Sequence, residues 1–530
     1  MTARGIKMML ILFLGTFTRM EAYCQSLDYD YVKSSEAWLS SKNAAGLKRL
    51  PVDGVSRAGI RSRFCNGGFV NYNESDKSFI YGLSTESFLR AGNSIVFSGS
   101  VSYDAETFES MSGSVFMNPS DNLFDILDDE QYPGVKKKEM YRLKGGIAWS
   151  ATPRLTIGTN LGYESGNYAK MKDLRHVNSL LDLDFAPGFS YYLGRRMLVG
   201  LNLAYRRRVE SVGFQQSGQS SVSYNSLVSF GNFYGQKQVF SDGNYNAPTS
   251  QPLFDEYLGS DLQFSFEPLQ GLKIFNELSY RDRSGYYGIR SSKSIVFSEH
   301  KGRLLGLSGE ASYTVGNDAH RLEYIFQYSD GNNNQNVYSH VNDPETGNTV
   351  IKYSGSNEAG RKSVMIASVA YTFDKNIASF LPRWELTAAA SFWNRHTKAS
   401  VYPFYRNQDL SQLRFDFLGK HNLVRGSNRF STHIGASVAK GGGEMYVDGF
   451  YTQPSSSQKE PSSSAYFLKR EYEYLTAART EGSATFEYSR ALNKSVAAYV
   501  SINCLYLHAF AIESIGADRI EACISIGTRF

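Results

Sequence analysis

Large apolar residues and polar residues alternate along most of the chain. The segment 155–163 (LTIGTNLGY) has an apolar or aromatic side chain at nearly every second position, and 199–207, 272–281 and 321–329 repeat this pattern. Because successive side chains of a β-strand point to opposite faces, a period of two predicts strands with one apolar and one polar face. The last segment, 519–530 (RIEACISIGTRF), alternates in the same way and ends on an aromatic residue.

The alternation predicts a chain made almost entirely of strands. About 18 strands are expected, with 14 to 18 compatible with the pattern, at 54–73, 78–89, 94–104, 138–149, 155–165, 178–192, 197–208, 256–267, 272–282, 302–314, 320–329, 363–373, 384–397, 411–421, 429–450, 466–490, 496–508 and 519–530. Helical periodicity is expected only near residues 30–45.

The connections between these strands alternate in length. Short turns rich in Gly, Pro, Asn and Asp lie at 151–154, 193–196, 268–271, 315–318 and 491–494, and long polar segments lie at 105–137, 211–255, 330–362 and 452–464. Outer-membrane barrels have short periplasmic turns and long extracellular loops. The sequence therefore predicts an all-β fold, a transmembrane antiparallel up-and-down β-barrel with both of its ends on the periplasmic side.

Aromatic residues mark both ends of the predicted strands. Trp149 and Tyr313 precede short turns, whereas Tyr163 and Tyr205 lie near the far ends of strands on the apolar face. At about 3.3 Å per residue and a tilt of about 45°, the segment 155–163 covers ~21 Å, close to the apolar band of about 25 Å in such barrels. A secreted β-sandwich also has alternating strands, but its apolar face packs on a second sheet and needs no aromatic girdles. The barrel is the preferred interpretation.

Composition agrees with this fold class. The 530 residues include 36 Tyr, 34 Phe and 47 Gly but only 13 Pro, and aromatic residues favour strands. The net charge of +5 and the lack of a basic tail indicate no nucleic-acid partner. No internal run reaches the 18 or so apolar residues of a membrane helix.

The N-terminus has the pattern of an export signal. Arg4 and Lys7 precede the apolar core 8–17, and Cys24 is followed by Gln25. We expect a signal peptide at 1–24, a periplasmic or lumenal segment at 25–53, and the outer-membrane β-barrel at 54–530. A lipoprotein reading of Cys24 is the alternative, although Tyr23 stands where a small residue is expected.

The mature cysteines and the acidic stretches suggest no site chemistry. Cys504 and Cys523 fall on neighbouring strands but on opposite faces, so no disulfide is expected between them. The stretches 121–130 and 330–336 contain oxygen ligands that suit Ca²⁺ but lack the spacing of a known calcium loop, which favours solvated surface loops. We assign no catalytic, cofactor-binding or metal-binding residue, and we do not expect an enzyme or a cofactor.

The polar faces of the strands are expected to line the lumen. They carry charges of both signs, among them Arg142, Lys144, Arg206, Glu164, Glu277 and Glu487. A barrel of about 18 strands is wide enough for an aqueous channel. The first functional hypothesis is a channel or facilitator for solute passage. The alternative is a partner-binding or scaffold barrel without an open pore, which serves a surface lipoprotein or a secretion or uptake complex.

The last strand and two other segments resemble known families. A final Phe530 resembles the assembly signal that Gram-negative outer-membrane barrels present to the insertion machinery, and outer-membrane lipid and lipopolysaccharide are the further partners implied. The stretches 144–178 and 189–210, with paired Gly and Tyr-ended strands, resemble outer-membrane β-barrel proteins of the Bacteroidetes kind, and no activity follows from this likeness. The segment 41–47 (SKNAAGL) is similar to the Asn-Pro-Ala-Gly-Leu segment near the start of long-chain fatty-acid transporter barrels.

Overall fold

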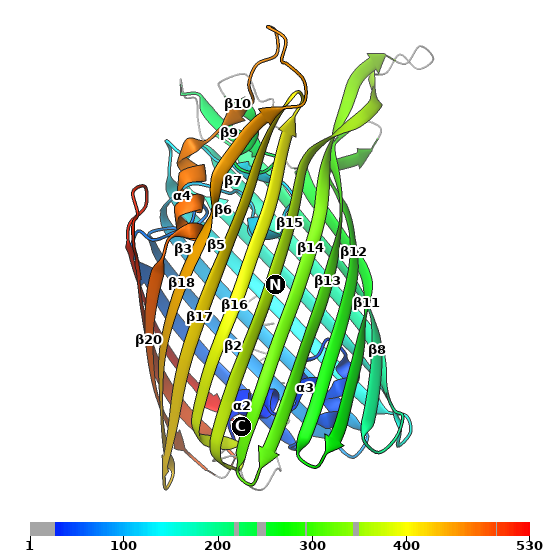
Figure 1. Ribbon diagram of the computed structural model, residues 1–530, viewed down its shortest axis with the longest axis vertical. Helices are drawn as coiled ribbons and strands as arrows, with labels where there is room; N and C mark the ends of the chain where they lie inside the picture. Colours follow the sequence, from blue (N-terminus) through cyan, green and yellow to red (C-terminus); the bar gives the residue numbers. More distant parts are fainter. Residues whose placement is uncertain (1–26, 217–221, 241–250, 292–293, 343–348, 494) are drawn as a thin grey trace, which may run out of the picture.

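A single antiparallel sheet of 18 strands closes on itself and forms a barrel (Figure 1). The computed structural model describes residues 27–216, 222–240, 251–291, 294–342, 349–493 and 495–530. Closure occurs at β1 (Gly54–Asn66), which pairs with β2 (Lys77–Ala91) on one side and with β22 (Asp518–Arg529) on the other. The predicted fold class and strand number are confirmed. The predicted signal peptide, 1–24, lies outside the described residues.

The remaining strands follow one another around the wall in chain order. They are β3 (Ile95–Met111), β5 (Gly134–Ser150), β6 (Leu155–Lys170), β7 (Arg175–Tyr192), β8 (Met197–Gln215), β11 (Gln251–Leu269), β12 (Leu272–Ser291), β13 (Ser294–Val315), β14 (Asp318–Asn342), β15 (Thr349–Ala378), β16 (Leu381–Val401), β17 (Phe404–Arg425), β18 (Asn428–Phe450), β20 (Arg479–Ala491) and β21 (Ala497–Ala509). A small second sheet contains β4 (Asp125–Leu127), β9 (Tyr224–Ser229), β10 (Tyr234–Phe240) and β19 (Ser462–Ser463).

The apolar faces of the strands point outward. Ile524 of β22 is 52% exposed and pairs with the exposed Ile502 of β21, while their polar neighbours face the lumen. Leu201 and Tyr280 are likewise exposed on the outer wall. A closed barrel with a continuous apolar outer face is the form in which strands can cross a bilayer, since every backbone group of the wall pairs within it. The protein is an integral protein of the bacterial outer membrane.

Short turns close the strands at the end of the barrel where β1 begins and β22 ends, at the bottom of Figure 1. Gly271 (φ +84°) and Gly316 (φ +57°) occupy the left-handed region there, which is accessible to glycine at little cost. These are two of the turns expected from the sequence, at 268–271 and 315–318. This end is the periplasmic one.

The predicted loop at 330–362 is mostly strand, which corrects the sequence analysis. β14 has 25 residues and β15 has 30, and the two strands pair far beyond the height of a bilayer. Polar residues extend as strand here because the neighbouring strand satisfies their backbone groups. The Asn-rich stretch 330–336 therefore lies in a strand of the wall and not in a surface loop.

The predicted strand at 466–490 is wrong in its first half. Residues Ala465–Thr476 form helix α4, whose first turn is capped by the Ser464 side chain. Phe467, Leu468 and Glu471 are buried, with the spacing of one helix face, although the local sequence also alternates. Among the described residues, no helix is long and apolar enough to cross a membrane.

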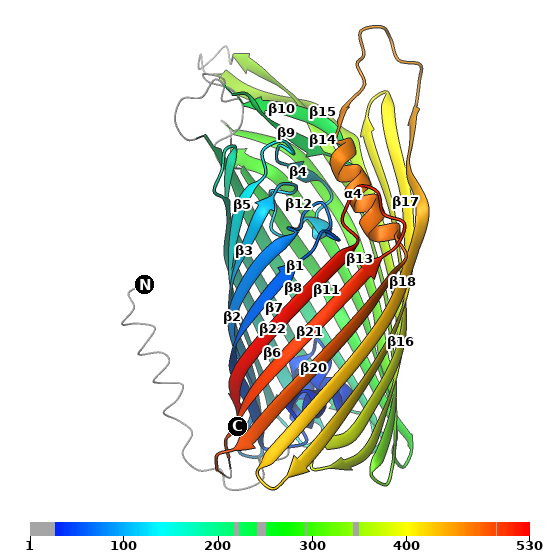
Figure 2. The same ribbon diagram turned by 90° about the vertical axis from the view of Figure 1, so that its left-hand side faces the viewer.

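Two short helices and a 3₁₀ segment form at the predicted helical region near 30–45. They are α2 (Tyr29–Ser34), α3 (Ala37–Ser40) and η1 (Ala44–Arg49), and all three lie inside the lower part of the barrel (Figure 2). A second 3₁₀ turn, η2 (Pro119–Asp121), belongs to the connection between β3 and β5. The described cysteines are free, in agreement with the opposite faces expected for Cys504 and Cys523.

Candidate functional site

Residues 27–53, here called the N-terminal insert, occupy the periplasmic part of the lumen. Asp28 caps α2 by accepting hydrogen bonds from the backbone N–H groups of Asp30 (3.0 Å) and Tyr31 (3.3 Å). The apolar residues of the insert pack on a patch of the wall; this cluster contains Tyr29, Val32, Leu39, Ala44, Leu47 and Leu50 with Val55, Phe88, Val96 and Ala148. The insert is therefore folded against the wall and not simply threaded through the barrel.

A buried ion cluster anchors the start of the insert to the opposite wall. Oδ2 of Asp28 lies 2.5 Å from Nη2 of Arg429 and 3.1 Å from Nζ of Lys420. Burial alone would raise the pKa of Asp28, but the charges of Lys420 and Arg429 outweigh burial and hold this pKa well below its usual value. Asp28 is thus a carboxylate at neutral pH and a counterion for two buried cations.

Further polar contacts tie the insert to the rest of the circumference. Asn43 donates to Gln263 of β11 (2.9 Å), and the Lys42 backbone N–H donates to Glu277 of β12 (2.9 Å). On the far side, Arg321 of β14 donates to the Ser34 carbonyl (2.7 Å). Contacts to strands so widely separated around the wall mean that the insert crosses the lumen.

Close approach of the insert to the wall depends on a glycine in β6. A Cβ added at Gly158 would lie 2.5 Å from the Ala45 nitrogen, closer than real Cβ atoms come. Gly158 thus leaves room for the backbone of η1 beside the wall.

The connection between β3 and β5 folds down into the extracellular half of the lumen. Its acidic stretch 121–130 contains Asp128, which lies 3.0 Å from Nζ of Lys136 and 3.1 Å from Nζ of Lys170, all three fully buried. The backbone N–H of Met117 donates to Glu210 of β8 (2.8 Å). The stretch 121–130, which was expected to be a solvated surface loop, is therefore packed in the interior. Asp128 is the counterion of two lysines of the wall.

The small sheet and helix α4 complete this extracellular layer, which we define as residues 112–133, 224–240 and 462–476. Arg395 of β16 donates to both carboxylate oxygens of Glu471 in α4 (2.8 and 2.7 Å). Asn232, between β9 and β10, donates to the Thr397 carbonyl (3.1 Å). Figure 2 shows α4 against the inner side of the wall formed by β17 and β18. The layer contacts the wall on several sides, as the N-terminal insert does below it.

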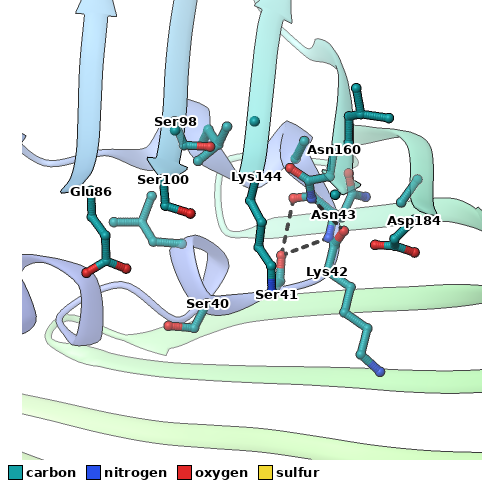
Figure 3. Close-up of a pocket in the computed structure, with 18 of the residues that line it drawn as sticks. Ser40, Ser41, Lys42, Asn43, Glu86, Ser98, Ser100, Lys144, Asn160 and Asp184 are labelled. Atoms are coloured by element: carbon teal, nitrogen blue, oxygen red, sulfur yellow. Dashed lines mark hydrogen bonds between the residues drawn. The ribbon is translucent and has the colours of Figure 1, made fainter. Parts of the chain in front are cut away.

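A polar chamber of about 710 Å³ lies along the upper side of the N-terminal insert (Figure 3). The insert contributes Ser40, Ser41, Lys42 and Asn43, and the wall contributes Glu86, Ser98, Ser100, Lys144, Asn160, Glu164, Asp184 and Arg206. Small-molecule sites in proteins occupy about 300–1,000 Å³, so the chamber can hold a small solute. Its lining offers hydroxyl, amide and carboxylate groups together with cations.

Ion pairs across neighbouring strands fix the charges of the chamber wall. Arg206 pairs with Asp182 at 2.6 Å, and Lys144 lies 3.6 Å from Glu164. Arg281 pairs with the fully buried Asp261 at 2.7 Å. The alternation placed Lys144, Arg206 and Glu164 on the lumenal face, and the structure places them there. The balance of signs makes the chamber polar without a net attraction for one kind of ion.

The sequence assigned no catalytic, cofactor-binding or metal-binding residue, and that remains a prediction. Within the described part of the chain, no group of three or more His, Cys, Asp or Glu side chains could hold a metal ion. The chamber itself was not predicted, because its lining comes from β2, β3, β5, β6, β7, β8 and β12 together with the insert. The one signal for it was the set of mixed charges on the polar faces.

Comparison with known proteins identifies the family. Residues 44–530 match the model described as a family of unknown function, DUF6850. The chain belongs to this family. No curated protein matches the sequence.

Several solved outer-membrane structures are similar to this member of DUF6850. The siderophore receptor PiuA from Acinetobacter baumannii has 8% identity and a TM-score of 0.38, over 89% of this chain and 82% of PiuA. The toluene transporter TbuX from Ralstonia pickettii has 9% identity and a TM-score of 0.31, over 92% of each chain. The iron transporter FrpB from Neisseria meningitidis has 10% identity and a TM-score of 0.35, over 89% of this chain and 82% of FrpB. The proposals below rest on the lumen and outer wall of this barrel alone.

Proposed function

We propose that this protein is a gated facilitator that carries a small polar solute across the outer membrane through the lumenal chamber. The observation that carries the proposal is the chamber itself, a polar space of about 710 Å³ enclosed by the barrel wall and the N-terminal insert. A barrel that only anchored a partner would gain nothing from a polar space in its lumen. A solute that both donates and accepts hydrogen bonds matches the lining.

The N-terminal insert is the proposed gate on the periplasmic side. It is bound to the wall through polar groups at its ends and middle, such as Asp28, Lys42 and Asn43, and through its apolar cluster. Hydrogen bonds exchange with water at modest net cost, so opening is opposed mainly by the buried ion pairs of Asp28 and by the apolar surface that would be exposed. The apolar cluster around Tyr29 and Leu47 keeps it seated at rest.

Blocking the chamber tests the proposal. Gly162 of β6 lines the chamber, and a Cβ added there would touch only Asp184, at 3.4 Å, so Gly162→Trp adds a bulky side chain to the space without a backbone clash. Gly145 on the neighbouring strand β5 points outward, and a Cβ there would meet nothing within 4 Å. Gly145→Trp is therefore the matched control, because it places the same side chain in lipid.

The assay is solute-driven swelling of liposomes that contain the purified protein, with arabinose and glycine as probes. We expect swelling with the wild type and with Gly145→Trp, and a severalfold slower rate with Gly162→Trp. Absence of flux and of conductance in the wild type would contradict the proposal. Equal rates for the two Trp variants would contradict the chamber as the route.

A partner-binding barrel is the second candidate, and the extracellular layer favours it. Packed structure fills the upper lumen, Tyr402 and Tyr451 are exposed at the tips of the wall, and Tyr466 is exposed on α4. Such aromatic side chains suit a protein interface. Extraction of the native membrane with mild detergent would separate the two candidates: a stoichiometric surface lipoprotein or secretion component supports this one, and a lone conducting barrel opposes it.

A further inference from the structure

The outer wall changes from apolar to charged at a defined height on strands β12–β16, which form the near wall in Figure 1. On β13, the outward side chains run from Tyr313 through Leu307 and Leu305 to Arg303 and Lys301. The ten residue steps from Tyr313 to Arg303, at about 3.3 Å each and a tilt of about 45°, cover ~23 Å. Arg303 thus lies at the upper edge of the apolar band, and Lys301 lies at the height of the lipid headgroups.

Three cations form a row at this height. The register pairs Lys301 with Asn332 of β14, Asn332 with Arg361 of β15, and Arg361 with Lys398 of β16. Side chains that are paired across an antiparallel ladder point the same way, so all four face the membrane side of the wall. We call Lys301, Arg361 and Lys398 the basic row.

The basic row lacks the carboxylate partners that its neighbours have. Directly below it, Arg303 is paired with Asp330 at 3.2 Å. Among the described residues, neither Lys301 nor Arg361 nor Lys398 forms an ion pair within 4.0 Å. Arg361 and Lys398 lie directly opposite each other and repel, so an anion bound at this height would stabilise the row.

The row borders a shallow hollow of about 320 Å³. Its lining includes Lys301, Arg303 and Arg361, with the carboxylates of Asp282, Asp330 and Glu358 around them. Asp330 is paired with Arg303, and Asp282 lies directly across the ladder from Arg303. Glu358 also lines the hollow and partly offsets its positive charge, but no carboxylate of the described residues lies within 4.0 Å of Lys301 or Arg361, so these two cations are open to an anion.

The third cation is held in position by aromatic rings. Nζ of Lys398 lies 4.9 Å from the ring centre of Tyr405 and 4.7 Å from that of Tyr451. The ring of Tyr451 is stacked on that of Tyr402, and its hydroxyl is hydrogen-bonded to the Ser400 hydroxyl. Cation–π contacts of this kind orient an exposed lysine.

We propose that the basic row is a binding site for the phosphorylated glucosamine headgroup of lipid A in the outer leaflet. The lipid supplies phosphates at the height of Lys301 and Arg361, and its acyl chains lie along the apolar wall below, over Leu305 and Tyr328. Arg binds phosphate in a bidentate manner and Lys binds it as a point charge. The site holds one glycolipid against strands β13–β16 and does not depend on solute passage through the lumen.

The test uses the full mature protein in detergent micelles and native mass spectrometry. The probes are diphosphoryl lipid A, fully dephosphorylated lipid A, phosphatidylglycerol and inorganic phosphate. The test variant carries Lys301→Gln, Arg361→Gln and Lys398→Gln. The control variant removes three outward cations dispersed over other strands, with Lys137→Gln, Arg207→Gln and Lys440→Gln.

Each Lys or Arg beside an anionic lipid surface contributes about fivefold in affinity, so the test variant is expected to lose on the order of a hundredfold for diphosphoryl lipid A. The control variant is expected to bind nearly as the wild type does. Equal losses in the two variants would overturn the site. Binding of dephosphorylated lipid A or phosphatidylglycerol as tight as that of diphosphoryl lipid A, or displacement by millimolar inorganic phosphate, would overturn the assignment to lipid A. On a gel, the unboiled samples of both variants should migrate differently from the boiled samples, which confirms that both variants are folded.

Discussion

The substitution Asp28→Asn isolates the charge that anchors the N-terminal insert. Asparagine is as good a helix cap as aspartate, so the start of α2 keeps its hydrogen bonds. What changes is the ion cluster, in which Lys420 and Arg429 lose their counterion while they stay buried. Removing one partner of a buried ion pair costs about 3–5 kcal/mol. We expect most of this cost to fall on the seating of the insert, because the wall strands are held by their ladders.

The substitution Asp30→Asn, two residues further along the chain, provides the control. Asp30 pairs with Arg57 at 2.9 Å, but the two side chains are 66% and 37% exposed, so Asp30→Asn should cost about 0–1 kcal/mol. Hydrogen exchange of peptides from residues 27–53 measures the opening of the insert. An opening made easier by 3–5 kcal/mol corresponds to exchange faster by about two to four powers of ten in Asp28→Asn. Planar-bilayer recordings should show more frequent openings in this variant alone.

The low pKa of Asp28 gives the experiment a pH dependence with a definite sign. A carboxyl group whose pKa is lowered by folding contributes stability above its unfolded value, near 3.8, and loses it as the pH falls further. Relative to the intrinsic exchange rate at each pH, the protection of the insert in the wild type should therefore fall in acid toward that of Asp28→Asn. Exchange of the insert that is equal in wild type and Asp28→Asn, or in Asp28→Asn and Asp30→Asn, would refute the reasoning.

Two further predictions concern the extracellular layer and the outer wall. Burial raises the pKa of Asp125 to about 7, so the stability it contributes is complete below pH 3.8 and lost as the pH rises to about 7. After division by the intrinsic exchange rate at each pH, the protection of residues 114–127 should be lower at pH 8 than at pH 5, and Asp125→Asn should remove this difference in protection. Ile524→Lys places a charge in the bilayer and should cost about 2–4 kcal/mol in urea unfolding from lipid, whereas Ser501→Lys on the adjacent strand faces the lumen beside Glu487 and should cost little; equal costs would contradict the outward orientation of Ile524.

Local sequence was sufficient to predict the wall because the signal repeats along every strand. Ile524 and Leu201 are exposed to the bilayer, as their alternation with polar residues indicates. The same local signal failed where a second element decided the outcome. Residues 465–476 alternate but form α4, since Phe467 and Leu468 are buried in the extracellular layer. The stretch 330–336 has a loop composition but extends as strand because β13 and β15 pair with it on both sides.

The residues that form the candidate site could not be predicted from the local sequence. Lys144, Asn160 and Arg206 come from three strands, and each was recognised only as a lumenal residue. Asp28 and Arg429 are 401 residues apart, and nothing local in either segment indicates that they meet. The cations of the basic row were not singled out either, because their common height depends on the strand register.

The order of residues along the chain was enough to predict a membrane barrel, strands that alternate between lipid and water, and tight turns such as those at 268–271 and 315–318. Each of these properties follows from interactions over a few residues, repeated along the chain. The occupation of the lumen by the N-terminal insert and the extracellular layer became evident only from the folded barrel. The same is true of the polar chamber beside the N-terminal insert. The reason is physical: closing the sheet brings strands far apart in the chain to one enclosed space, and the fit of side chains in that space depends on all of them at once.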